Sequence, residues 1–204
     1  MSGRRIRRGL RIRGVSQSKG PRTGPALGPS RQNVDVTTRQ VPPRSDAIRQ
    51  VPYEHPDVTP LVEDLQAVYV SIYGEPDGTP VAPGELTPPG GAFFVAYEGD
   101  EPIAIGGWRW LDPSTYAVPG ERPIEIKRMY VVERARGRGH ARAMLVHLEA
   151  TAAAQGADWA LLMTGAPQLD AITLYRRSGY EDVPRFGYYA WAPDAVHLGK
   201  RLAP

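Results

Sequence analysis

The stretch from Glu125 to Leu148, EIKRMYVVERARGRGHARAMLVHL, decides the fold. Its opening predicts a strand of mixed character from Ile124 to Val132. Glycine and arginine then fill Arg134-Ala-Arg136-Gly137-Arg138-Gly139. From His140 to Ala154 apolar residues recur at helical spacing, on a face formed by Ala141, Met144, Leu145 and Leu148. The stretch therefore predicts a strand, a glycine-rich loop and a helix in direct succession.

The loop has the properties of an anion site. Glycine lets the backbone turn tightly and approach a ligand without a Cβ in the way. The first turn of a helix leaves N–H groups unpaired, and the helix dipole favours an anion there. Arg134, Arg136 and Arg138 add positive charge around the same point. A diphosphate group fits this combination.

Other interpretations of the loop are weaker. A dinucleotide-binding fingerprint needs a third glycine, and Arg142 stands at that position. A Walker loop ending in Gly-Lys-Ser/Thr is absent from the sequence. An Arg-Gly segment that binds RNA stays open, as does a plain turn with exposed arginines.

The remaining pattern predicts a mixed sheet flanked by helices, an α/β fold. A helix is expected from Asp57 or Thr59, with Pro60 in its first turn, to Gly74. Another is expected over Leu169–Arg177. Strands are expected over Ala47–Tyr53, Ala92–Glu98, Glu101–Trp110, Trp159–Met163, Tyr180–Trp191 and Ala195–Leu202. Gly99-Asp100 is a hairpin turn between the second and third of these strands.

Composition narrows the function classes. The 204 residues are 41% hydrophobic and include no cysteine, which removes disulfides and a cysteine nucleophile. The four histidines show no paired metal-ligand spacing, so no metal site is expected. The sequence has no run of about eighteen apolar residues, so no membrane span is expected. A cytoplasmic location fits these features.

Charge divides the chain. Residues 1–44 hold eleven Lys or Arg and one acid; the other 14 basic and 21 acidic residues give the body a net charge of −7. We expect a disordered basic tail over residues 1–45 and one domain over residues 46–204. The tail resembles a transit peptide or a nucleic-acid-binding arm in composition, but we favour a solvated segment or a start codon assigned too far upstream, because charge runs usually solvate.

Two motifs resemble one family. Arg134-x-x-Gly137-x-Gly139 matches the Gln/Arg-x-x-Gly-x-Gly/Ala signature of the GNAT superfamily, the Gcn5-related N-acetyltransferases. Ala171-x-x-Leu174-Tyr175-x-x-x-Gly179-Tyr180 resembles the family's late helix, with Gln168 where asparagine is usual. The similarity covers roughly residues 46–204. It implies the GNAT acyl-CoA N-acyltransferase fold, a mostly antiparallel central sheet with splayed strands.

The resemblance also implies a donor, acetyl-CoA, with no metal. The strand before the loop would splay from its neighbour and pair with the pantetheine arm through the backbone of Met129, Tyr130 and Val131. The pyrophosphate would lie on the amides of the loop, formed by Arg134, Arg136, Gly137, Arg138, Gly139, His140 and Ala141.

Two catalytic residues follow from the same resemblance. Tyr175 matches a tyrosine that many relatives place near the sulfur as general acid, although it could instead be a packed aromatic residue. Glu125 stands where some relatives carry a catalytic glutamate. Strand alternation predicts Glu125, Lys127 and Met129 on one face, and a Glu125–Lys127 surface pair is an equal alternative. His140 and His147 are not expected to be catalytic, and His147 is expected near the polar side of its helix.

The acceptor is expected to be an amine, of a small molecule or a protein. Candidates for its pocket are Tyr69, Tyr73, Trp108, Trp110 and Tyr188. Trp108 and Trp110 should share one sheet face, with core packing expected for at least one. A homodimer and an acyl-CoA sensor without activity both stay open. So does a nucleic-acid or ribosome-associated protein that binds through the tail.

Overall fold

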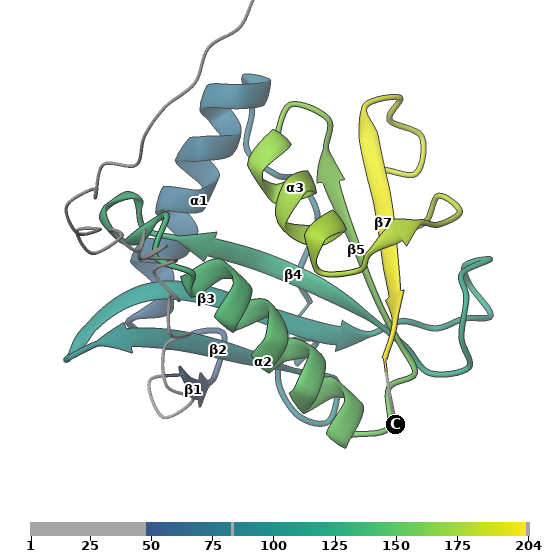
Figure 1. Cartoon of the computed structure of the whole chain (residues 1–204), viewed down its shortest axis with the longest axis horizontal. Coiled ribbons are helices and arrows are strands. Elements are labelled where there is room, and N and C mark those ends of the chain that lie inside the picture. The colour runs from purple at the N-terminus through teal and green to yellow at the C-terminus, as the bar shows by residue number, and fades with distance from the viewer. Residues whose placement is uncertain (1–47, 83, 203–204) are drawn as a thin grey trace, which may run out of the picture. The chain divides into compact units, whose positions relative to one another are not determined.

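A seven-stranded mixed sheet forms the centre of the fold. The computed structural model describes residues 48–82 and 84–202, so the predicted tail over residues 1–45 lies outside them. The strands follow the order β1-β2-β3-β4-β5-β7-β6, and every neighbouring pair is antiparallel except β4 and β5 (Figure 1). Their bounds are β1 (Ile48–Val51), β2 (Gly91–Glu98), β3 (Glu101–Trp110), β4 (Pro123–Val131), β5 (Trp159–Gly165), β6 (Glu181–Asp182) and β7 (Ala195–Arg201).

The helices are α1 (Val58–Tyr73), α2 (His140–Ala154) and α3 (Leu169–Arg177). The bounds of α2 and α3 agree with those predicted. Gly74 ends α1 at a φ of 82°, where a left-handed backbone favours glycine, and its N–H donates to the carbonyl of Val70. Asp57 occupies the N-cap of α1, but its carboxylate accepts a bond from the Tyr97 hydroxyl at 2.7 Å and caps no helical amide.

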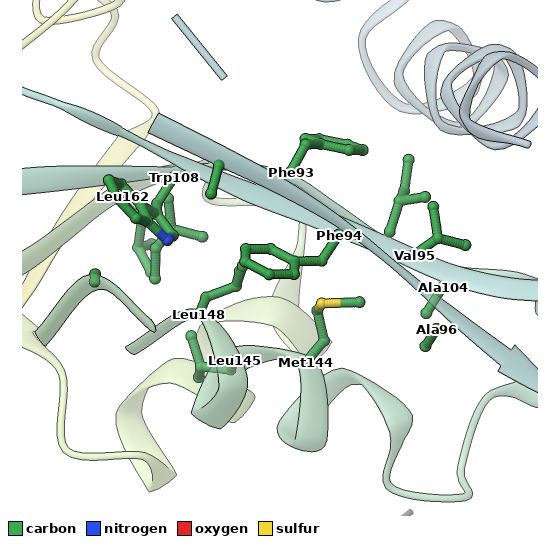
Figure 2. Packing of buried hydrophobic residues seen from close by; sticks show 14 of the residues in the cluster. Phe93, Phe94, Val95, Ala96, Ala104, Trp108, Met144, Leu145, Leu148 and Leu162 are labelled. Carbon is green, nitrogen blue, oxygen red and sulfur yellow. The ribbon is translucent and has the colours of Figure 1, made fainter. Parts of the chain in front are cut away.

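The main core lies between α2 and the β2–β4 part of the sheet. Met144 and Leu148 of α2 lie next to Phe94 from β2, and Leu145 belongs to the same buried cluster (Figure 2). All three helix residues are completely buried, and each large apolar side chain so buried contributes about 1.5–3 kcal/mol. Phe93 points to the opposite face of β2 (Figure 2).

The parallel strands β4 and β5 stay together over three residue pairs only. The pairs are Pro123–Trp159, Ile124–Ala160 and Glu125–Leu161; beyond them the strands share no pairing. The two arrows separate in Figure 1. The splayed strands that the family resemblance implied are confirmed at this point.

A bulge changes the faces of β4. The register with β3 shifts between Ile105 and Gly107, and Arg128 has a φ of 57°, which is unusual for a residue with a side chain. Lys127 lies opposite Gly107, whereas Met129 packs next to Gly106 with the α2 side chains. The prediction that Glu125, Lys127 and Met129 share a face is therefore wrong, because one extra residue interrupts the alternation.

The predicted strand over Tyr180–Trp191 is also wrong, since only Glu181 and Asp182 pair with β7. Pro184 and Gly187, with a φ of 74°, interrupt the extended backbone. The Arg185 guanidinium donates to the carbonyl of Ala192 at 2.7 Å and holds the segment as a loop.

Candidate functional site

The glycine loop joins β4 to α2 through a short 3₁₀ turn, η2 (Glu133–Ala135). Gly137 and Gly139 have φ values of 72° and 88°, which a side chain would strain. A Cβ built on either glycine meets no atom within 4 Å, so both face open space. Gly139 is the N-cap of α2 and no side chain caps this end. The amides of the first helical turn have no carbonyl partner within the helix, so this end suits an anion.

The loop arginines contact acidic and aromatic neighbours. Arg134 pairs with Glu101 and Arg138 with Glu98, so the two acids flank the turn between β2 and β3. Both arginine side chains are 49% exposed, and exposed pairs of this kind are weak. Arg136 donates to the Val131 carbonyl at 3.0 Å and lies over the ring of Tyr130. The arginines surround the loop and are free to exchange weak partners for a phosphate.

His140 follows the loop as the first residue of α2. Burial, together with the positive charge of Arg138, lowers the pKa of His140. The ring therefore adds little positive charge near neutral pH, and the contribution of this residue to an anion site comes from its amide.

The Tyr175 side chain reaches from α3 to β4, at the part of β4 that no longer pairs with β5. The side chain is 8% exposed, and its hydroxyl approaches the Met129 sulfur at 3.8 Å. Burial raises the pKa of Tyr175 to about 12, so the phenol keeps its proton at neutral pH. The hydroxyl is thus a protonated donor beside the open edge of β4.

A cavity of about 320 Å³ lies on the other face of β4, toward α1. Its aromatic lining comes from α1 and the loop before β7: Tyr69, Tyr73, Tyr189 and Trp191. Consecutive residues of the bulge, Lys127 and Arg128, also line it. Burial raises the pKa of Tyr69, and Asp77 and Tyr175 add to this rise. The Tyr175 hydroxyl is therefore within electrostatic range of a cavity side chain.

Arg128 fixes the loop that follows α1 against β4. Its guanidinium pairs with Asp77 and donates to the Thr79 carbonyl at 2.9 Å, and its side chain is 5% exposed. Although burial opposes it, bonds from Thr79 and the charge of Arg128 lower the pKa of Asp77. This buried pair shapes one wall of the cavity.

Glu125 lies beneath the cavity and is absent from its lining. Its carboxylate pairs with Arg109, whose Nη2 atom is 2.8 Å away, and lies 3.5 Å from the Lys127 ammonium. Arg109 also pairs with Glu85. The predicted Glu125–Lys127 pair therefore exists but is buried, with Glu125 4% and Lys127 7% exposed. The proposed catalytic role of Glu125 remains a prediction.

The structure separates the acceptor-pocket candidates. Tyr69 and Tyr73 line the cavity, whereas Tyr188 does not. Trp108 packs edge-to-face on Trp110 at 5.4 Å, which confirms their shared face, and donates to Thr151 of α2. These two tryptophans belong to the core side of the sheet. The lining residues that sequence reasoning missed include Asp77, Arg128, Tyr189 and Trp191, although the aromatic run around Tyr189 was a visible signal.

His147 also differs from its predicted surroundings. Its ring packs edge-to-face on Phe94, with the centroids 4.7 Å apart, and lies against the core instead of near the polar side of α2. Burial lowers the pKa of His147.

The chain is similar to known proteins in sequence and in fold. Residues 89–182 match the family model of the acetyltransferase (GNAT) domain. The resemblance to the GNAT acetyltransferases that the two sequence motifs indicated is confirmed over this segment. A curated relative, "IAA acetyltransferase" of Azospirillum brasilense, is 29% identical over 168 residues, covering 82% of this chain and 99% of the relative.

Solved structures share the GNAT fold. A Klebsiella pneumoniae protein assigned to the acyl-CoA N-acyltransferases aligns with a TM-score of 0.62 at 24% identity, over 76% of this chain and 97% of that one. An aminoglycoside 6'-N-acetyltransferase complexed with coenzyme A aligns with a TM-score of 0.54 at 17% identity, over 77% and 97%. The GNAT family uses acetyl-CoA, and the match to its family model supports acyltransferase activity.

Residues 48–82 and 84–202 contain no group of three or more His, Cys, Asp or Glu side chains arranged to hold a metal ion. In the same ranges no helix has both the length and the apolar character needed to cross a membrane.

Proposed function

We propose that this GNAT domain transfers the acetyl group of acetyl-CoA to a primary amine, which attacks the thioester directly in a ternary complex. The divergence of β4 from β5 carries the proposal. On one face of the divergence lie the glycine loop and Tyr175, and on the other lies the cavity that contains Lys127. A donor and an acceptor bound on the two faces would meet at the open edge of β4.

On the donor side, the backbone edge of β4 that is not paired with β5 leads to the anion site of the glycine loop. Beyond Glu125, one edge of β4 pairs with β3 and the other is not paired with β5. An extended ligand adds to such an edge as a strand would, so Met129, Tyr130 and Val131 are the proposed partners of the pantetheine arm. The pyrophosphate would follow onto the loop amides between Arg134 and Ala141.

The reaction needs few groups. The amine nitrogen forms a bond to the thioester carbon, the carbon–sulfur bond breaks, and the amine gives up one proton. The Tyr175 hydroxyl donates a hydrogen bond to the departing sulfur, where negative charge develops. Glu125 is the proposed acceptor of the amine proton, which would travel through water because Glu125 does not line the cavity.

Calorimetry with acetyl-CoA, followed by an assay of free CoA release with a panel of amines, tests the proposal. We expect binding and amine-dependent release. Binding without turnover of any amine would instead favour an acyl-CoA sensor, and failure to bind would refute both. A nucleic-acid role rests on residues 1–45, outside the described chain, and predicts affinity that falls steeply with salt.

A further inference from the structure

Lys127 is a buried cation without a matching acceptor. Its side chain is 7% exposed and lines the cavity. Its ion pair is with Glu125 at 3.5 Å, beyond ordinary hydrogen-bond length, and Glu125 already accepts two closer contacts from Arg109. Within the described parts of the chain the Lys127 ammonium makes no hydrogen bond. A buried ammonium in this state favours a ligand oxygen on the cavity side.

The neighbouring cation cannot serve the same purpose. The Arg128 guanidinium is engaged by Asp77 and by the Thr79 carbonyl. Lys127 is therefore the cation of the cavity lining whose donors remain available to an anionic group. A carboxylate is the small anionic group that most often accompanies an amine on an organic molecule.

The distance between the bound carboxylate and the reacting nitrogen depends on where Lys127 lies along β4. Lys127 is two residues past Glu125, the last residue of β4 that pairs with β5, and two before Met129, whose sulfur contacts Tyr175. A carboxylate bound at Lys127 is therefore close to the point of acetyl transfer. An α-amino acid satisfies this requirement, because its amine and carboxylate share one carbon.

The rest of the cavity indicates the side chain of the acceptor. Four aromatic rings line it, and a volume of about 320 Å³ lies at the small end of ligand pockets, which suits one small molecule better than a folded protein segment. Glu75 and Asp194 are exposed members of the lining and favour the ammonium of an approaching zwitterion.

We propose that the acceptor is a free α-amino acid with an aromatic side chain, whose carboxylate pairs with Lys127. This inference rests on the proposed function and names the substrate class of the same site. The rival role for Lys127 is that of general base. Burial lowers the pKa of its ammonium, which favours that role. The two roles predict different activities when the Lys127 amino group is removed.

The test uses matched acceptors that differ in the carboxylate alone: tryptophan with tryptamine, and phenylalanine with phenethylamine. Full-length protein and its Lys127→Met variant are assayed for CoA release, with acetyl-CoA binding followed by calorimetry. Lys200→Met is the matched control, because it also removes an ion-paired lysine, here from Glu149, and does not line the cavity.

For the wild-type chain we expect kcat/KM for the amino acid to exceed that for the amine about 10- to 100-fold, the value of one charged hydrogen bond. Lys127→Met should lower kcat/KM for the amino acid to about the value for the matched amine and leave the binding of acetyl-CoA unchanged. Equal loss of both activities would overturn the inference in favour of a base, as would a wild-type preference for the amines. Absence of turnover with every amine would refute the proposed function itself.

Discussion

Replacing Tyr175 with phenylalanine removes one hydroxyl at the proposed point of transfer. Among the described residues this hydroxyl contacts the Met129 sulfur alone, at 3.8 Å, so its loss should lower the free energy of unfolding by less than about 1 kcal/mol. Positioned acids contribute about 10²- to 10⁴-fold to a rate. The pKa of Tyr175 is about 12, whereas a thiol has about 8.5, so complete proton transfer to the sulfur is uphill. We therefore expect an effect at the low end of this range. The value of kcat should fall about 100-fold, which corresponds to about 2.7 kcal/mol.

The assay compares kcat from CoA release, acetyl-CoA affinity from calorimetry, and stability from urea unfolding. Tyr97→Phe is the matched control, because it removes a hydroxyl that donates to Asp57 at 2.7 Å and Tyr97 does not line the cavity. We expect that variant to lose about 1 kcal/mol of stability and to keep its kcat. A Tyr175→Phe variant with wild-type kcat would refute the donor role of the hydroxyl.

The remaining predictions concern the loop and the buried pair. Gly137→Asp should abolish acetyl-CoA binding by calorimetry, because it puts negative charge beside the anion site; Gly84→Asp, another open glycine at positive φ, should keep it. Asp77→Ala should lower the free energy of unfolding by about 3 kcal/mol in urea, since it leaves Arg128 buried and unpaired, and an unchanged midpoint would contradict this. The lowered pKa of Asp77 stabilises the fold above the unfolded value of about 3.9, so that stability should disappear as pH falls through the folded pKa. Urea unfolding at pH 7 and pH 3 should then show a smaller pH effect in Asp77→Asn than in the wild type.

Local signals allowed much of the donor side to be predicted. The helix over His140–Ala154 has its apolar face, its glycine start and its arginines within one continuous stretch. The helix over Leu169–Arg177 likewise has Gly179 close behind its end. Residues that define such elements are neighbours in sequence, so periodicity and punctuation are sufficient to locate them.

The bulge at Arg128 has no comparable signal. Glycine or asparagine at a positive φ would have marked a break in the strand, but an arginine does not. Its conformation is held by Asp77, which is 51 residues away in the sequence. Such a contact is formed by the assembled fold, and strand alternation alone therefore placed Met129 on the wrong face.

Two errors in the sequence predictions, the shared face of Glu125, Lys127 and Met129 and the strand over Tyr180–Trp191, concern segments that line the acceptor cavity. That cavity is assembled from α1, the loop after it, the β4 bulge, the end of β5 and the loop before β7. The bulge directs both Lys127 and Arg128 to the cavity and leaves Met129 for Tyr175 on the opposite face. One inserted residue thus separates an acceptor side from a donor side on a single strand. The donor side can be recognised from a continuous motif, whereas the acceptor side depends on contacts between distant segments, which is why the acceptor must be inferred from the structure.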